Sequence, residues 1–205
     1  MPIPRQLYRE NILDDPIESL SFFVEQKIAR IQTVTLVKVV KTYNNDGIEP
    51  VGFVDVQPLI QQLNYDGTAT DHGIIHKIPY FRLQGGSNAI IIDPKVGDIG
   101  MCGFCSRDSS GVVANKDTAA PNCLRQYDLS DGLYIGGMLN GTPKQFIRFS
   151  SEGVEITASH VTINCDVTVN GKVTATGDVI GGDISLDNHT HTGVSTGPSN
   201  TGKPQ

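Results

Sequence analysis

Two histidines near the end of the sequence, His189 and His191, are separated only by Thr190 in the stretch "DNHTHTGVSTGPSNTGKPQ". In an extended strand, residues i and i+2 point to the same side, so both imidazoles can face one direction while the threonine faces the other. Imidazole nitrogens are common ligands of transition metals. The pair therefore predicts a metal site, and the alternative is a solvent-exposed pair in a polar tail.

The cysteines are further candidates for metal or redox chemistry. Cys102 and Cys105 form a CxxC motif in "GDIGMCGFCSRD", and Cys123 could supply a third ligand. However, no second CxxC motif or nearby histidine completes a four-ligand site. The apolar residues around the motif predict a buried strand, in which cysteine behaves as a small apolar side chain. Cys165 alternates with valine and isoleucine and is also predicted to be a core residue.

A second pair of histidines, His72 and His76, lies four residues apart. In a strand this spacing separates the side chains too widely for a clean chelate. We interpret both as surface or interface residues, with metal binding as the alternative.

The segment that leads to His189 has the most regular pattern in the sequence. From residue 154 to residue 186, apolar and polar residues alternate with a period of two, apart from parity changes near residues 159–160 and 182–183. The apolar positions are Val154, Ile156, Ala158, Val161, Ile163, Cys165, Val167, Val169, Val173, Ala175, Val179, Ile184 and Leu186. This period predicts extended strand without helix.

This apolar face is too narrow to bury itself, and no helix or second sheet remains in the sequence to cover it. An isolated ribbon of this kind is marginally stable at best. Three chains wound about a common axis would enclose the valines and isoleucines in a slender core and leave no free sheet edge. We therefore predict a homotrimer, and the alternative is a one-sided sheet packed on the N-terminal part of the chain.

The N-terminal part begins with a predicted helix. Asp15 can cap it, Pro16 suits its first turn, and Glu18 occupies the capping-box position. Its apolar residues recur at helical spacing and are Leu20, Phe23, Val24, Ile28 and Ile31. Short β-branched segments separated by turns such as "NNDG" then follow up to about residue 128. About five short strands with one helix predict a small Greek-key barrel of the OB type.

Composition and charge exclude some classes of function. The net charge of −6 argues against a general nucleic-acid-binding protein, so nucleic acid is not expected as a partner. The first residues lack the pattern of a secretory signal peptide, and no apolar run approaches the ~20 residues of a membrane-spanning helix. We therefore expect a protein that is made in the cytosol and soluble there.

The order of these parts resembles the central spike proteins of contractile-tailed phages and related tailocins. The most specific features are the His-x-His motif and the Gly-, Ser-, Thr- and Pro-rich tail after it, and "PKVGDIG" is a weaker similarity to the OB domain of that family. The resemblance implies that the OB domains trimerise at the tail-tube end and that the β region is an intertwined triple-stranded helix. It further implies that His189 and His191 of all three chains bind one iron ion at the apex.

The chemistry of the histidine pair agrees with this resemblance. Three symmetric chains would offer six imidazoles, which form an octahedral nitrogen shell. Structural zinc prefers four ligands, whereas iron and nickel accept imidazole and six-coordination more readily. A saturated octahedron has no open position, so the single ion per trimer would be structural. Whether other ions lie along the axis is left open.

We accordingly expect a mainly all-β fold with four parts. Residues 1–30 form an arm and helix, 31–129 an OB-fold domain, 130–186 the triple-stranded β-helix and 187–205 the metal-binding apex. The resemblance implies a spike in the baseplate of the virion tail, made in the host cytoplasm and attached to hub and tail-tube proteins. During sheath contraction such a spike pierces the bacterial outer membrane.

Two other functions are consistent with parts of the pattern. A trimeric tail fibre or receptor-binding protein could have the same β region, although such proteins usually end in a broad globular head. A metal-dependent enzyme would need an open metal position with an acid or base beside it. Asp187 and Asn188 are close in sequence, but no 2-His-1-carboxylate site is visible. We therefore do not expect an enzyme.

Overall fold

A computed structural model of the chain describes residues 16–44, 47–48, 50, 52–64, 66–190, 193 and 197. The chain divides into two units, Met1–Pro143 and Lys144–Gln205. Strands outnumber helices in the described residues, as predicted for a mainly β protein. The predicted N-terminal arm before residue 16 lies outside the described residues. No helix in the described part of the chain is both long and apolar enough to cross a membrane.

The predicted N-terminal helix is present as α1 (Pro16–Ala29). An acidic residue, Glu18, lies in its first turn and a basic residue, Lys27, lies in its last turn. Both charges interact favourably with the helix dipole and stabilise the helix. The expected cap, Asp15, lies outside the described residues. None of the residues of α1 is buried.

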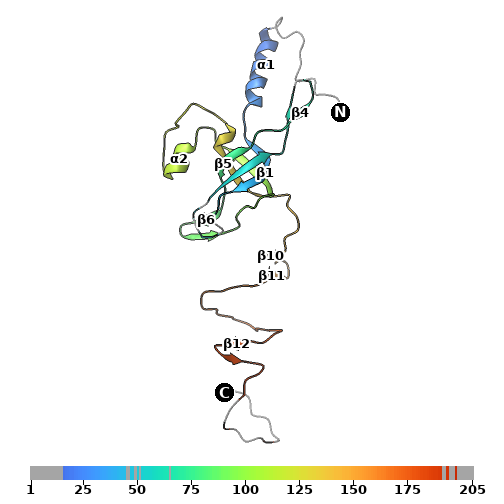
Figure 1. Cartoon of the computed structure of the whole chain (residues 1–205), viewed down its shortest axis with the longest axis vertical. Helices are drawn as coiled ribbons and strands as arrows, with labels where there is room; N and C mark the ends of the chain where they lie inside the picture. The colour runs from blue at the N-terminus through green and yellow to red at the C-terminus, as the bar shows by residue number, and fades with distance from the viewer. Residues whose placement is uncertain are drawn as a thin grey trace. The chain divides into compact units, whose positions relative to one another are not determined.

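Five strands form the sheet of the first unit (Figure 1). They are β1 (Val34–Thr42), β2 (Phe53–Pro58), β5 (Ile75–Pro79), β8 (Ile99–Phe104) and β9 (Gly132–Gly137). Their order is β5-β2-β1-β8-β9, and all neighbours are antiparallel. A parallel bridge between Tyr80 and Tyr134 joins the two edges of this sheet. The sheet is therefore curled around its own core.

The inward faces of these strands supply the core. In β1, Val37 and Val39 are fully buried while Lys38 between them is exposed, as expected for a strand with one face toward the core. The core consists of Val37, Val39, Val54, Val56, Ile75, Ile78, Tyr80, Cys102 and Tyr134. Cys102 is fully buried and is therefore a small apolar core residue, as predicted, and its burial raises the pKa of the thiol to about 12.

Two short hairpins and two short helical segments complete the first unit. The hairpins are β3 (Gln62–Leu63) with β4 (Ala69–Thr70), and β6 (Leu83–Gly85) with β7 (Asn88–Ile90). The helical segments are α2 (Ser110–Asn115), which the sequence patterns did not predict, and the 3-10 turn η2 (Leu129–Asp131). A buried ion pair between Arg82 and Asp93, with Nη2 2.7 Å from Oδ1, fixes the chain on both sides of the β6–β7 hairpin.

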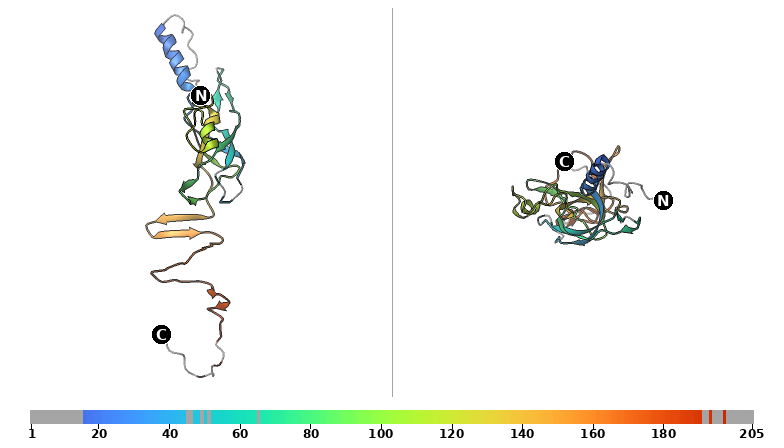
Figure 2. Two further views of the ribbon diagram at one scale, coloured as in Figure 1. Left: turned by 90° about the vertical axis from the view of Figure 1, so that its left-hand side faces the viewer. Right: turned by 90° about the horizontal axis from the view of Figure 1, so that it is seen from above.

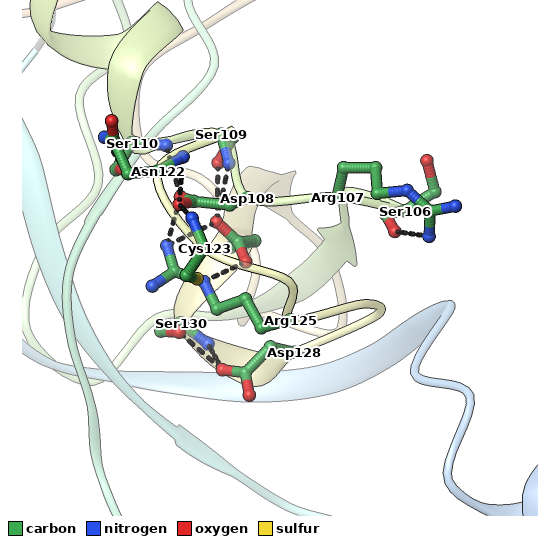
Figure 3. A network of polar contacts seen from close by, with 11 residues as sticks. Ser106, Arg107, Asp108, Ser109, Ser110, Asn122, Cys123, Arg125, Asp128 and Ser130 are labelled. Carbon is green, nitrogen blue, oxygen red and sulfur yellow. Dashed lines mark hydrogen bonds and ion pairs between the residues drawn. The ribbon is translucent and has the colours of Figure 1, made fainter. Parts of the chain in front are cut away.

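A polar network holds the long connection between β8 and β9 (Figure 3). Arg125 donates from Nε to Asp131 at 2.6 Å and from Nη2 to Asp108 at 2.5 Å. Asp131 also accepts from the backbone N–H of Ser109 at 2.8 Å. The hydrogen bond from Arg125 is the main cause of the lowered pKa of Asp131. The hydrogen bonds from Ser110 contribute most to the lowered pKa of Asp108.

The boundary between the units differs from the one expected near residue 130. Strand β9 pairs with β8 and therefore belongs to the sheet of the first unit. Glycines allow this close pairing: a Cβ on Gly100 would lie 2.2 Å from the carbonyl oxygen of Gly136. The Gly-rich stretch "DGLYIGG" thus closes the sheet instead of starting the β region, and the first unit extends to Pro143.

The described part of the second unit consists of hairpins and unpaired chain and contains no buried core. Its strands are β10 (Phe146–Ser150), β11 (Gly153–Thr157), β12 (Ile180–Gly181) and β13 (Ile184–Ser185), paired β10–β11 and β12–β13 (Figure 2). Not one of the described residues from 144 to 190 is buried. In the β10–β11 hairpin, Phe149 is 79% exposed and Val154 is 60% exposed.

The alternating segment between the two hairpins, residues 158–177, contains no strand and pairs with no other described segment of the chain. Every residue of this segment is described and exposed, including Cys165. Within these described residues, no backbone or side-chain group takes part in a hydrogen bond. Cys165, predicted as a core residue, is therefore exposed in the single chain.

Candidate metal-binding apex

The apex begins with the β12–β13 hairpin, in which Ile180 pairs with Ser185 and Gly181 with Ile184. Gly182 in its turn has a φ of 63°, in the left-handed region that glycine adopts without strain. Just outside the hairpin, the N–H of Leu186 donates to the carbonyl of Val179 at 2.9 Å. The chain therefore reverses direction immediately before His189.

Two side chains hold the segment between the hairpin and His189. Asp178 accepts a hydrogen bond from the N–H of Asp187 at 3.1 Å, and the Ser185 hydroxyl oxygen accepts one from the N–H of Asn188 at 2.9 Å. The hydrogen bond from the Ser185 side chain, followed by that from the Asp187 N–H, lowers the pKa of Asp178. A charged Asp178 therefore fixes the backbone two residues before His189.

The ring of His189 is oriented by backbone carbonyls of the same hairpin. Its Nδ1 lies 2.9 Å from the carbonyl oxygen of Ser185 and 3.1 Å from that of Leu186. Because carbonyl oxygens only accept, Nδ1 must carry the hydrogen. In the neutral ring, Nε2 then carries the lone pair, which is the nitrogen that can ligate a metal. A ring N–H held by a backbone carbonyl is the usual support of a metal-binding histidine.

The second predicted ligand, His191, lies outside the described residues. Within the described part of the chain, no group of three or more His, Cys, Asp or Glu side chains could hold a metal ion. One chain offers only the two imidazoles of the motif, and a full ligand shell would have to come from several chains.

The other histidines expected at the surface lie in separate polar contacts. His76 Nδ1 is 2.9 Å from Oδ2 of buried Asp55, whereas His72 Nδ1 is 2.8 Å from Nε2 of Gln62. Burial raises the pKa of Asp55, but hydrogen bonds led by the one from His76 outweigh this effect and lower it. The structure therefore gives His72 and His76 different partners and no common site.

The remaining cysteines also lie apart from the core. Cys105 follows β8 and is exposed, and Cys123 is exposed although its N–H donates to Asp108 at 3.1 Å. The expectation that Cys105 is a core residue is therefore wrong, because β8 ends at Phe104 and the chain leaves the sheet there.

Sequence patterns missed the residues that position His189. In the sequence pattern, Asp178 and Ser185 are simply polar positions of the alternating segment. The "GGD" stretch between them signals a tight turn, and a turn there brings Asp178 close to the residues just before the histidine. That signal could have identified both side chains.

The family model of the GpV Apex motif matches residues 183–205. The match covers the second strand of the hairpin, both histidines and the polar tail. It supports a structural role in a phage tail, at the baseplate spike, and a place in the virion tail. A search among curated proteins found no match to the chain.

Proposed function

We propose that three copies of this chain form the central spike of a contractile phage tail, which pierces the bacterial outer membrane when the sheath contracts. The observation that carries the proposal is the coreless second unit, which leads into a segment that matches a spike apex motif. A chain that cannot bury its own apolar residues requires other chains to do so.

The trimer is supported by two independent features of residues 158–177. Their valines and isoleucines are exposed, for example Ile163 at 59% and Val167 at 61%. Their backbone N–H and C=O groups have no partners within the described chain, although extended segments normally pair these groups. Three intertwined copies would satisfy both needs, because each chain would supply a paired strand and an inner face to the next.

The first unit is proposed to be an OB-type barrel that faces the tail tube and hub. The support is its strand order, β5-β2-β1-β8-β9, together with the parallel bridge that joins the outer strands. This connectivity is that of a five-stranded Greek-key barrel. In this arrangement the barrel attaches the spike to the baseplate, and the second unit projects toward the cell.

The apex is proposed to bind one iron ion through His189 and His191 of three chains. The residues fit such an ion, since the hydrogen bonds of Nδ1 place the lone pair of the neutral His189 ring on Nε2. Six imidazoles form a saturated shell, so the ion would tie the strand ends together and supply no catalysis. The cross-section of the proposed apex is too small for an apolar core. Metal–ligand bonds would supply the stabilisation that such a core supplies elsewhere. We accordingly propose no enzymatic activity.

The proposal is tested by the mass of the purified full-length chain in solution, measured by light scattering together with metal analysis. We expect three chains and about one iron ion per particle. A monomer would contradict the proposed spike. A trimer with one metal ion per chain would contradict the shared site while leaving the trimeric architecture in place.

A further inference from the structure

Leu139 is an exposed apolar residue in an unfavourable backbone conformation. Its φ is 58°, in the left-handed region that bulky side chains rarely adopt, and its side chain is 73% exposed. A residue remains in such a conformation only where the surrounding contacts hold it there. The described part of the chain therefore gives neither burial nor a favourable backbone as a reason for leucine at this position.

Hydrogen bonds to Ile99 hold the chain on both sides of Leu139. The N–H of Met138 donates to the carbonyl of Ile99 at 2.7 Å. The side chain of Asn140 accepts from the N–H of Ile99 at 2.9 Å and donates to its carbonyl at 3.3 Å. Because Ile99 is the first residue of β8, these contacts fix the bend around Leu139 to the sheet. The leucine is thus presented on a rigid part of the first unit.

A hollow of about 230 Å³ lies beside this bend, and its lining includes Phe81, Ile92, Pro94, Tyr134, Gly137 and Asn140. Phe81 and Ile92 are 51% and 83% exposed, so much of the wall is apolar surface in contact with solvent. The N–H of Phe81 donates to the carbonyl of Tyr134 at 2.7 Å, which fixes this wall to β9. An apolar cavity of about 150 Å³ accommodates benzene, so the hollow has room for one leucine side chain.

The bend and the hollow lie where the chain leaves the first unit. That unit ends at Pro143, and β10 begins at Phe146. At no more than about 3.6 Å per residue, Leu139 lies within about 25 Å of this strand along the chain. The proposed function brings three second units together around one axis, so the three chain exits must lie close to that axis. The surface beside each exit consequently faces a neighbouring chain.

We propose that Leu139 of each chain inserts into the hollow of the next chain, between Phe81 and Ile92. This inference rests on the proposed trimer. In a cyclic trimer each chain presents different sides to its two neighbours, so a projecting residue and a hollow on the same chain are both filled when the ring closes. Burial of the leucine side chain would offset its unfavourable φ. The contact would join the three first units beside the point at which the chains intertwine.

Disulfide cross-linking of the full-length trimer tests this contact. Leu139→Cys and Ile92→Cys are introduced together, and the exposed cysteines are replaced by serine, namely Cys105, Cys123 and Cys165. Oxidation should then link each chain to the next and give a covalent trimer on a non-reducing denaturing gel. Leu139→Cys with Val96→Cys is the control, because Val96 is 65% exposed but does not line the hollow. No covalent trimer is expected from the control.

The outcomes separate this inference from the proposed function. A particle that is a trimer by light scattering but gives no covalent trimer in the Leu139 and Ile92 double variant would overturn the insertion alone. A hub protein or another segment of the same chain in the hollow would produce that result. Disulfides within single chains, which run as monomers on the gel, would overturn the insertion in the same way. A monomer of the unaltered chain in solution would overturn the proposed spike as well.

Replacing Leu139 with glycine tests the burial of its side chain without added thiols. Glycine adopts a φ of 58° without strain, so this change would stabilise the protein if Leu139 were simply exposed. We expect the urea midpoint of the full-length trimer to fall instead, at a fixed protein concentration, because a buried side chain is lost. The control is Lys116→Gly, at the exposed end of α2 with a φ of 55°, which should not lower the midpoint. A midpoint that stays or rises in Leu139→Gly would overturn the insertion.

Discussion

Arg125 and Asp131 form a two-pronged ion pair, with Nε 2.6 Å from Oδ2 and Nη2 2.9 Å from Oδ1. The same guanidinium donates to Asp108 at 2.5 Å, so one cation joins the beginning and the end of the connection between β8 and β9. Asp131 is only 2% exposed and lies directly before β9. The placement of the last strand of the sheet therefore depends on this contact (Figure 3).

Replacing this carboxylate should destabilise the first unit. In Asp131→Asn, the charge opposite Arg125 is lost, and one of the two carboxylate oxygens that now accept hydrogen bonds becomes an NH₂ donor. We expect the free energy of unfolding of the first unit to fall by about 2 kcal/mol. Urea denaturation followed by circular dichroism measures this loss. The matched control Asp128→Asn retains the ability to cap η2 and should change stability by less than about 0.5 kcal/mol. Equal losses in both variants would contradict a special role for the ion pair.

The same network predicts how stability depends on pH. The pKa values of Asp108 and Asp131 are lowered from the ordinary value of 3.8 in the folded chain. A group with a lowered folded-state pKa contributes stability above its ordinary pKa and loses that contribution as the pH falls toward the folded value. We therefore expect the urea midpoint of the first unit to be steady near neutral pH and to decline below about pH 4. In Asp131→Asn, the urea midpoint should decline less steeply as the pH falls. An unchanged decline would contradict the contribution of the Asp131 carboxylate to the pH dependence.

The four cysteines predict a pattern of thiol reactivity that reports on assembly. Cys102 is buried with its pKa raised to about 12 and should not react with iodoacetamide in the folded protein. Cys105 and Cys123 are exposed and should react. Cys165 is exposed in the single chain but belongs to the inner face of the proposed trimer, so we expect it to be protected until the trimer is unfolded. Rapid labelling of Cys165 in the assembled protein, read by mass spectrometry of its peptide, would argue against that packing.

Sequence patterns predicted α1 well because its capping residues and its helical spacing of apolar residues are local signals. They assigned β9 to the wrong unit. Its buried side consists of Tyr134 and of glycines, and these glycines are needed only because β8 pairs closely with β9. They also missed α2, a six-residue helix whose adjoining loop is fixed by Asp108 from outside the helix. The position of His189 could be predicted from its motif. The hydrogen bond that Asp178 accepts from the Asp187 N–H depends on the turn around Gly182, which the alternating pattern does not indicate and only the "GGD" stretch signals.

The observed boundary predicts where the chain can be divided. A chain that begins at Asp131 would keep β9 without its partner β8 and would leave an apolar strand unpaired. A chain that begins at Lys144 lacks the whole first unit and divides none of its strands. We expect the Lys144 form to be trimeric and soluble and the Asp131 form to aggregate, as measured by light scattering. A monomeric Lys144 form would show that the second unit does not hold the trimer together by itself.

The last prediction concerns the apex. If His189 and His191 of three chains share one ion, His189→Ala with His191→Ala should abolish bound iron, while the mass in solution stays that of a trimer. The trimer should persist because the valines and isoleucines of residues 154–186 are untouched. Cys102→Ser with Cys105→Ser is the control and should retain about one iron ion per three chains.

The variant Ser185→Ala tests the support of the His189 ring. The backbone carbonyl of residue 185 that orients the ring remains, so metal should still bind. The lost hydroxyl contact to the Asn188 N–H should loosen the last residues. Metal that survives loss of both histidines, or that disappears with the cysteines, would exclude the apex as the binding site.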